Sequence, residues 1–312
     1  MAFGRDERAV PVLHGVSLDV HAGRTLCIVG ESGCGKSVTM LAATRLLGGR
    51  ARVGGTVELD GEDLLGLPEP AMERIRGRRI AMIFQDPMSS LNPVHRIGTQ
   101  LVEALALHRG LRGAAAQAEA ARLLDRVGIP AATQRLRDYP HQLSGGMNQR
   151  VMIAMALAGE PDVLIADEPT TALDVTIQAQ ILDLLRRIQA EQGMAIVLIT
   201  HDLGVVAETA DRVAVMYCGR IVEQAPTERI FASPEHPYTR GLLDSLPRMA
   251  RDEVALSPIP GAVPQPGDMP SGCAFAPRCA AAMPACSGLV PRLADRAQGH
   301  AVACLARGQV AA

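Results

Sequence analysis

The sequence has no Trp and only four Phe and three Tyr among its 312 residues, so aromatic side chains can supply little of the core. Because 48% of the residues are nevertheless hydrophobic, we expect a large core built from aliphatic side chains. The sequence also lacks a long basic run, and its 31 Lys and Arg nearly balance its 33 Asp and Glu. This balance argues against a nucleic-acid-binding protein.

Two further absences bear on where the protein works. The first ten residues lack the apolar segment of a signal peptide. No stretch of about 18 uncharged apolar residues is present to cross a membrane. We therefore expect a soluble protein of the cytosol. In that reducing compartment, its seven cysteines are expected to bind metal or to pack as small apolar side chains rather than to form disulfides.

Apolar segments alternate with helical patterns between residues 12 and 231. The predicted strands are an alternating one between 12 and 24 and continuous apolar ones within 25–30, 79–85, 162–168 and 194–202. Helical spacing predicts helices within 91–159 and over 174–193, and a hairpin over 212–224 is expected to turn at Cys218-Gly219. Apolar strands that alternate with helices favour a mainly parallel sheet covered on both faces. After about Phe231 the sequence becomes rich in Pro, Ala and Gly, which predicts a loop-rich appendage.

The stretch GESGCGKS, residues 30–37, fits the phosphate-loop pattern G-x-x-x-x-G-K-[ST]. Its glycines let backbone N–H groups converge on phosphates, Lys36 reaches the β- and γ-phosphates, and the Ser37 hydroxyl ligates Mg²⁺. A chance match on a glycine-rich turn is the alternative, but the apolar strand before it and the helix after it argue against chance. The expected nucleotide contacts are Gly30, Ser32, Gly33, Cys34, Gly35, Lys36, Ser37 and Val38.

Two carboxylates follow the apolar run VLIADE, residues 163–168. At this strand end Asp167 is suited to hold Mg²⁺, and Glu168 to take a proton from an attacking water. The alternative is that the following stretch, DEPTTALD, only makes a turn and caps a helix. Taken alone the two interpretations weigh evenly, and the phosphate loop tips the balance toward catalysis.

Four further motifs carry a family resemblance. They are IFQDP (83–87), LSGGMNQR (143–150), TALD (171–174) and LITHD (198–202). Each motif alone is common, but with the phosphate loop and the two carboxylates, in this order, the chain resembles the ABC-type ATPases over essentially its whole length. The resemblance implies an α/β fold, a P-loop NTPase of the ABC nucleotide-binding type with a helical subdomain and a loop-rich C-terminal extension. The implied domains are an ATPase core at 1–90 and 160–232, a helical subdomain at 91–159 and the extension at 233–312.

The resemblance also implies roles for residues outside the phosphate loop. Two such domains would dimerise head to tail, so that Ser144, Gly145 and Gly146 contact an ATP held by the partner. His201 would clamp the γ-phosphate, and Gln85 would touch Mg²⁺ and report occupancy to a membrane partner.

Two positions depart from the commonest family pattern. The signature has Met147 where Gln is frequent, which is usual in the subfamily considered next. Of the residues near the N-terminus only Phe3 could stack on adenine, and the alternative is a frayed terminal residue.

Several longer stretches resemble the ATP-binding subunits of bacterial dipeptide/oligopeptide importers. They are GESGCGKSVT, IFQDPMSSLNP, DEPTTALDVTIQAQIL and HPYTRGLLDSLP. This resemblance implies a peripheral ATPase at the cytoplasmic face of the cell membrane. Its implied partners are a second, different ATPase chain, two permease subunits and an extracytoplasmic solute-binding protein. Nickel, glutathione or another small solute stays open as cargo, and a soluble non-transport ABC ATPase or a non-hydrolysing subunit is the contrasting hypothesis.

Four of the seven cysteines lie in the C-terminal segment, at Cys273, Cys279, Cys286 and Cys304. Loops with so little periodicity gain ordering free energy from a bound metal. A [4Fe–4S] cluster suits four thiolates at irregular spacing, and this tail resembles that of peptide-importer ATPases that carry one. A structural zinc usually shows closer Cys pairs, although His300 could replace one ligand. Unlinked thiols are the third interpretation, and we favour the cluster.

Overall fold

The structure is a computed structural model that describes residues 1–4, 9–49, 51–86, 90–171, 173–246, 258–297 and 299–307. The chain forms two compact units. The first contains residues 1–19, 25–57 and 200–312, and the second contains residues 20–24 and 58–199. The phosphate loop and the C-terminal extension therefore belong to the same unit. The domain boundaries expected from the sequence remain a prediction.

The first unit is organised around five strands that are hydrogen-bonded in the order β12-β13-β11-β10-β3. Strands β3 and β10 run parallel, whereas the other neighbours are antiparallel. A small separate sheet has the order β2-β1-β4. The strands are β1 Ala2–Phe3, β2 Val10–Pro11, β3 Thr25–Val29, β4 Ala51–Arg52, β10 Arg212–Tyr217, β11 Arg220–Pro226, β12 Ala294–Ala297 and β13 His300–Val302.

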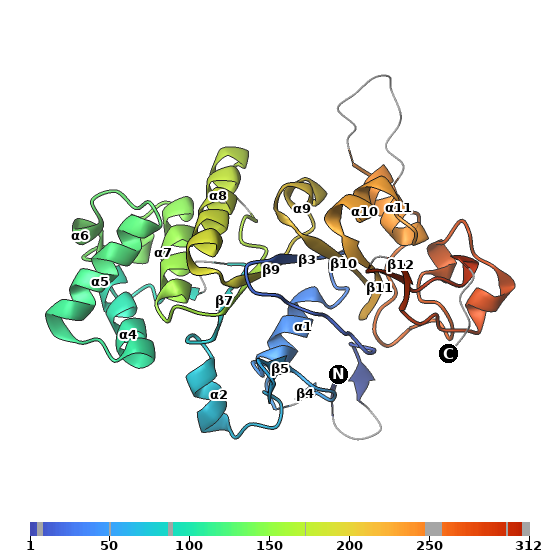
Figure 1. Cartoon of the computed structure of the whole chain (residues 1–312), viewed down its shortest axis with the longest axis horizontal. Helices are drawn as coiled ribbons and strands as arrows, with labels where there is room; N and C mark the ends of the chain where they lie inside the picture. Colours follow the sequence, from blue (N-terminus) through green and yellow to red (C-terminus); the bar gives the residue numbers. More distant parts are fainter. Residues whose placement is uncertain are drawn as a thin grey trace. The chain divides into compact units, whose positions relative to one another are not determined.

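Helices cover both faces of the β3-β10-β11 part of this sheet. Helix α1 lies on one side and helices α9, α10 and α11 lie on the other (Figure 1). The helices are α1 Lys36–Ala43, α9 Leu203–Thr209, α10 Thr227–Ala232 and α11 Pro237–Asp244, with 3₁₀ turns at Ala276–Arg278, Pro284–Ser287 and Leu305–Arg307. This layering buries β3 completely, which is why its five residues are apolar or small.

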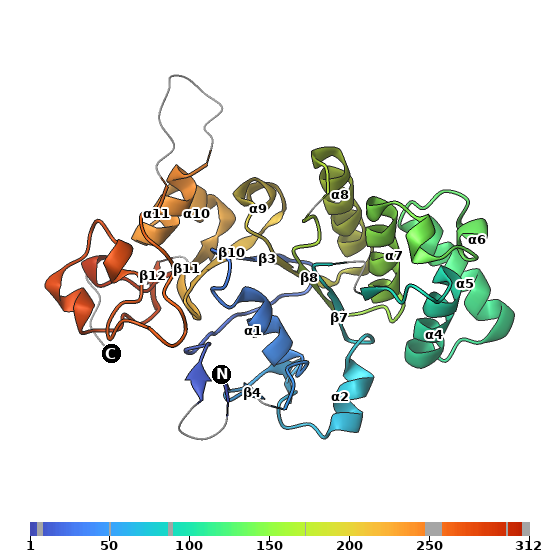
Figure 2. The same ribbon diagram turned by 180° about the vertical axis from the view of Figure 1, so that it is seen from behind.

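The second unit joins three parallel strands, in the order β9-β8-β7, to a group of helices. Helices α4, α5 and α7 pack on one another, and Figure 2 shows them in green together with α6. The elements are β5 Glu58–Leu59, β6 Glu62–Asp63, α2 Glu69–Ile75, β7 Ile80–Ile83, α4 Ile97–Arg109, α5 Gly113–Arg126, α6 Ala132–Arg135, a 3₁₀ turn Pro140–Gln142, α7 Gly145–Leu157, β8 Val163–Asp167, α8 Val175–Gln192 and β9 Ala195–Ile199.

Most of the predicted elements are confirmed. The continuous apolar runs form β3, β7, β8 and β9, and the helical patterns form α4, α5, α7 and α8. The core is aliphatic, and none of the helices in the described ranges is long and apolar enough to span a bilayer. The hairpin turns at Cys218 and Gly219, whose φ angles are 44° and 72°. Glycine is required at the second position because a Cβ there would lie 1.9 Å from the Val12 carbonyl oxygen.

The strand expected between residues 12 and 24 is wrong. At the start of this segment the backbone N–H groups bond to isolated carbonyls. Val12 and Leu13 donate to the Met1 carbonyl, and His14 donates to the Gly219 carbonyl. Only β2, which lies just before this segment, is a strand. Alternating polarity in this segment therefore did not predict pairing in a strand ladder.

The C-terminal extension is fastened to β11 by one buried carboxylate. Glu223 is fully buried and accepts hydrogen bonds from the backbone N–H of Glu235 (2.7 Å) and of His236 (2.9 Å). Its other contact is with the His300 ring, 2.7 Å from Nε2, on strand β13. The segment expected to be loop-rich thus adds two strands to the sheet, and Glu223 ties both of its ends to β11.

Replacing Glu223 with Ala should destabilise the protein by about 3–5 kcal/mol, because it leaves two backbone donors and the His300 ring without their buried acceptor. The shift of the urea unfolding midpoint measures this loss. The matched control is Glu228→Ala at an exposed position of α10, which should change stability by no more than about 0.5 kcal/mol. Equal midpoints for the two variants would contradict the anchoring role.

Candidate functional site

The phosphate loop follows β3 directly and ends in helix α1. Three of its glycines, Gly30, Gly33 and Gly35, have positive φ angles of 150°, 80° and 105°. A Cβ at Gly30 would lie 2.2 Å from the Met216 carbonyl oxygen of β10, and one at Gly35 would lie 2.9 Å from Leu13 Cδ2. The loop therefore needs glycine both for its backbone angles and for its close packing against β10.

Lys36 is the first residue of α1 and is buried. Its ammonium group donates to the Gly30 carbonyl at 2.7 Å and to the Glu31 carbonyl at 3.1 Å. A buried ammonium must be paired or hydrogen-bonded, and these two carbonyls hold it inside the curl of the loop. The other expected nucleotide contacts, Ser32, Cys34, Ser37 and Val38, lie on the same loop or in the first turn of α1. Burial raises the pKa of the Cys34 thiol against the opposing effect of Lys36.

His201, also in the first unit, lies just before α9. The carboxylate of Asp202 caps that helix by accepting from the Gly204 and Val205 N–H groups. The Asp202 N–H in turn donates to the Thr200 hydroxyl at 3.0 Å. These bonds on either side fix the backbone that presents the exposed His201 side chain.

In the second unit, three residues predicted for catalysis or for Mg²⁺ binding lie at the ends of β7 and β8. Asp167 is the buried last residue of β8, and Glu168 follows it. Oε2 of Glu168 accepts a hydrogen bond from Gln85 Nε2 at 3.2 Å and one from the Thr171 hydroxyl at 2.8 Å. Glu168 has a φ of 47°, a left-handed conformation that costs a non-glycine residue energy and that clusters at functional sites.

The helix-cap interpretation of the same stretch is correct for a different residue. Asp174 accepts from the Ile177 N–H at 2.9 Å and starts helix α8. The acidic residues of this stretch therefore have different roles. Glu168 accepts hydrogen bonds from the side chains of Gln85 and Thr171, and Asp174 caps helix α8. Of the TALD motif, residue 172 lies outside the described residues, as do residues 87–89 of the stretch after Gln85.

The signature motif forms the start of helix α7. Ser144 is its N-cap and accepts from the Met147 N–H at 3.3 Å, while Gly145 and Gly146 are the first helical residues. Ser144 and Gly145 are exposed, so the positive end of a 13-residue helix faces outward. A Cβ at Gly146 would lie 3.0 Å from Ile177 Cγ2, so glycine lets α7 and α8 approach closely.

Phe3 lies on β1, where it pairs with Val10 of β2 and Ala51 of β4. Its side chain is 37% exposed. The structure thus shows a Phe fixed in a small sheet rather than a frayed end. Its role at the adenine base stays a prediction.

The four C-terminal cysteines lie near one another in the extension. Cys273 donates its N–H to the Cys286 carbonyl at 2.8 Å. Burial raises the pKa of the Cys273 thiol, and the nearby thiols of Cys286 and Cys304 raise it further. Cys279 shows the same influences. Within the described residues, however, no three His, Cys, Asp or Glu side chains converge as they do around a metal ion.

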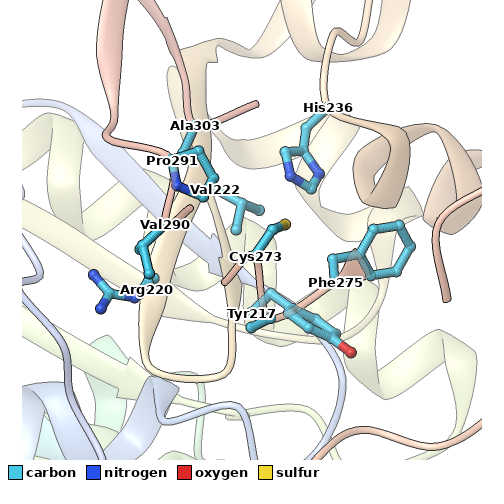
Figure 3. A pocket seen from close by; sticks show the side chains of 10 residues that line it. Tyr217, Arg220, Val222, His236, Cys273, Phe275, Val290, Pro291 and Ala303 are labelled. Carbon is cyan, nitrogen blue, oxygen red and sulfur yellow. The ribbon is translucent and has the colours of Figure 1, made fainter. Parts of the chain in front are cut away.

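This arrangement does not support the [4Fe–4S] prediction or the zinc alternative. His300 is instead bonded to Glu223, so it is not oriented toward the cysteines as a replacement ligand. A pocket of about 20 Å³ does lie beside Cys273, lined also by Tyr217, His236 and Phe275 (Figure 3). This volume has room for roughly one water molecule.

Three residues that contact the phosphate loop or form part of it were not predicted from the sequence. Glu31 lies in the loop, while Tyr238 and Arg278 reach it from the extension. One signal was present, because Arg278 is the only charged residue between Cys273 and Cys286. An isolated charge in a Pro- and Ala-rich segment indicates a specific partner.

Comparison with known proteins matches both parts of the chain. A family profile described as "ABC transporter" matches residues 13–171, and one described as "Oligopeptide/dipeptide transporter, C-terminal region" matches residues 222–286. A "Putative peptide import ATP-binding protein" of Brucella melitensis biotype 1 is 52% identical over 99% of this chain and 96% of its own length. Another protein of that description, from Brucella abortus (strain 2308), is 52% identical over 91% of this chain and 86% of its own.

Solved structures show the same fold. A dimeric post-hydrolysis structure of the ATP-binding cassette MJ0796, bound to ADP and Pi, has a TM-score of 0.64 and 27% identity, over 72% of this chain and 95% of that one. The structure of cbiO1 from Clostridium perfringens, part of the transporter complex cbiONQ, also has a TM-score of 0.64 and 27% identity. It covers 74% of this chain and 90% of that one.

Two glycine variants separate steric clash from backbone strain in the phosphate loop. Gly30→Ala forces a Cβ into the Met216 carbonyl, whereas Gly33→Ala meets nothing within 4 Å and only strains a φ of +80°. We expect Gly30→Ala to abolish ATP binding and to lower the melting temperature clearly. Gly33→Ala should cost about 1–3 kcal/mol and leave a folded protein. ATP titration and thermal unfolding measure both variants, and a Gly30→Ala protein that binds ATP like the wild type would contradict the geometry.

Proposed function

The chain belongs to the ABC transporter family, and from this premise we propose that it is the ATP-hydrolysing subunit of an importer that takes up di- and oligopeptides. The observation that carries the proposal is that a complete phosphate loop and a peptide-transporter C-terminal region occur in one chain. Relatives described by peptide import match it over nearly its whole length. A non-hydrolysing subunit is disfavoured because Lys36, Asp167, Glu168 and His201 are all present.

In the proposed reaction the phosphate loop binds the nucleotide. The Lys36 ammonium would exchange its present partners, the carbonyls of Gly30 and Glu31, for phosphate oxygens. Backbone N–H groups of the loop would bind further phosphate oxygens. Ser37, Asp167 and Gln85 are the residues proposed to hold Mg²⁺, which supplies positive charge to the phosphate oxygens when bound. The curled, glycine-dependent loop fits this role.

Glu168 is proposed to accept the proton of the attacking water as the bond to the γ-phosphorus breaks and ADP leaves. The hydrogen bonds that Gln85 and Thr171 donate to its Oε2 fix the direction of the carboxylate. His201 is proposed to clamp the γ-phosphate. Gln85 donates a hydrogen bond to Glu168 directly, so a movement of Gln85 would shift the carboxylate of the proposed general base. This contact is a proposed physical route from a permease to the hydrolysis step.

The partners are proposed from the same premise. The exposed N-terminus of α7, at Ser144, is suited to bind the phosphates of an ATP held by a second cassette. Membrane permeases complete the importer, and we propose two of them, with a different ATPase chain as the second cassette and a solute-binding protein outside. The chain would then lie at the cytoplasmic face of the membrane. Nickel or glutathione remains the alternative cargo, because these residues contact nucleotide and not solute.

The [4Fe–4S] cluster at the four C-terminal cysteines stays a separate prediction without support from the side-chain geometry. Iron and acid-labile sulfide content of anaerobically purified protein tests it, with Cys279→Ser as the comparison. Roughly four iron and four sulfide per chain, lost in the variant, would establish the cluster.

Glu168→Gln keeps the size of the side chain but removes the base. We expect ATP turnover to fall by at least about 100-fold while ATP binding is retained, because proton abstraction is lost and the phosphate loop is unchanged. Phosphate release and the nucleotide that co-purifies with the protein measure the two effects. The control is Glu191→Gln on the exposed side of α8, which should hydrolyse ATP like the wild type. Near-normal turnover in Glu168→Gln would contradict its assignment.

A further inference from the structure

Glu31 is the point at which the phosphate loop meets the C-terminal extension. Its carboxylate forms a bidentate ion pair with Arg278, with Nη1 2.7 Å from Oε2 and Nη2 2.9 Å from Oε1. Its backbone N–H donates to the Tyr238 hydroxyl at 2.8 Å. Two side chains of the extension, more than 200 residues away in sequence, therefore hold one loop residue by its side chain and by its backbone.

The start of helix α11 positions Tyr238 for this contact. His236 caps the helix by accepting from the Tyr238 N–H at 3.0 Å, and Pro237 occupies its first turn. Burial lowers the pKa of His236 to about 4, so the ring is neutral and able to accept at neutral pH. Tyr238 is fully buried, and its hydroxyl accepts from the loop residue Glu31. The tripeptide His-Pro-Tyr thus has a structural purpose at the phosphate loop.

Arg278 is fixed on its other side by the extension itself. Its side chain is 4% exposed, and its Nε donates to the Pro260 carbonyl at 2.9 Å. Its Nη1 also donates to the Tyr217 hydroxyl at 3.3 Å. Phe275 lies 5.3 Å from the ring centres of both Tyr217 and Tyr238. In a chain with so few aromatic residues, this aromatic cluster indicates a rigid support for the arginine.

The backbone of Glu31 is connected directly to the lysine that binds phosphate. The Glu31 carbonyl accepts from Lys36 Nζ at 3.1 Å and from the Cys34 N–H at 3.3 Å. A shift of Glu31 would therefore move an acceptor of Lys36 and change the curl of the loop. Since a binding group must be held within a fraction of an ångström to act, the support behind Glu31 bears on nucleotide affinity.

The charge of Glu31 poses a second requirement. A carboxylate in a loop that closes on phosphates repels them, and its side chain is only 30% exposed, so water screens it incompletely. The Arg278 guanidinium pairs with both carboxylate oxygens and offsets this charge.

We propose that the C-terminal extension is a positioning element for nucleotide binding, in which Arg278 neutralises and Tyr238 orients Glu31 so that the phosphate loop keeps its ATP-binding shape. Neither residue touches the reacting atoms, and both act through Glu31. The proposal rests on ATP binding at this loop. It assigns the extension a role in ATP binding, in addition to its similarity to the C-terminal region of peptide transporters.

The test compares ATP affinity in the full-length chain across a mutant cycle. Arg278→Gln should weaken ATP binding roughly tenfold, because it leaves the Glu31 carboxylate uncompensated beside the phosphates. Glu31→Gln combined with Arg278→Gln should bind within about threefold of the wild type, since the repulsive charge is then gone. Tyr238→Phe keeps the ring and should weaken binding by about three- to tenfold. In the hydrolysing complex, the KM for ATP should rise in Arg278→Gln while kcat stays within about twofold, because Lys36 and Glu168 are unchanged.

Arg240→Gln is the matched control, since Arg240 lies exposed in the same extension and its Nε donates to the Pro234 carbonyl rather than to the phosphate loop. It should bind ATP like the wild type, and thermal unfolding shows which variants remain folded. Wild-type affinity in both Arg278→Gln and Tyr238→Phe overturns the proposal. So does a double variant that binds no better than Arg278→Gln, because Arg278 would then act only by folding the extension. If the wild type itself fails to bind ATP, the proposed function falls first and this inference with it.

Discussion

The buried ammonium of Lys36 is the interaction on which the rest of the functional unit depends. A charge that is removed from water needs close acceptors, and here these are the carbonyls of Gly30 and Glu31. To turn those carbonyls inward the loop must adopt backbone angles that favour glycine, and it must lie against the Met216 carbonyl of β10. The same curl that satisfies the lysine in this structure is the shape proposed to bind the phosphates of ATP.

A series of hydrogen bonds connects the C-terminal extension to this loop. Strand β11 carries Glu223, which fixes the start of α11 and the His300 strand, and α11 carries Tyr238, which reaches the phosphate loop. Each step is a hydrogen bond to a buried or half-buried group, where such bonds are strongest. The C-terminal segment is therefore connected to the phosphate loop by these hydrogen bonds, although its sequence predicts a loop.

The sequence predicted those parts of the fold that repeat a simple pattern. Continuous apolar runs predict β3, β8 and β9 because a parallel strand is buried on both faces, and the glycines of residues 30–37 predict the loop because few other residues tolerate its angles. The alternation after residue 12 failed as a predictor, since the N–H groups of Val12, Leu13 and His14 bond to the Met1 and Gly219 carbonyls and form no strand ladder.

Contacts between residues that are far apart in the sequence could not be predicted from it. Glu31 and Arg278 are 247 residues apart, and nothing in either local sequence identifies the other as partner. The left-handed backbone conformation of Glu168 was likewise not predictable, because a glutamate in the sequence does not indicate a positive φ angle. The cysteines carried a strong pattern but did not yield ligand geometry, since spacing restricts which metals suit a segment without fixing how its side chains converge.

Peptide uptake by a strain from which this chain has been deleted tests the assignment most directly. Uptake of a labelled oligopeptide is expected to be lost in the deletion strain and to return with the wild-type chain, but not with a chain whose phosphate-loop lysine is replaced, Lys36→Ala. Uptake that continues in the deletion strain, or that returns fully with Lys36→Ala, would contradict the assignment of this chain as the ATPase that powers peptide import.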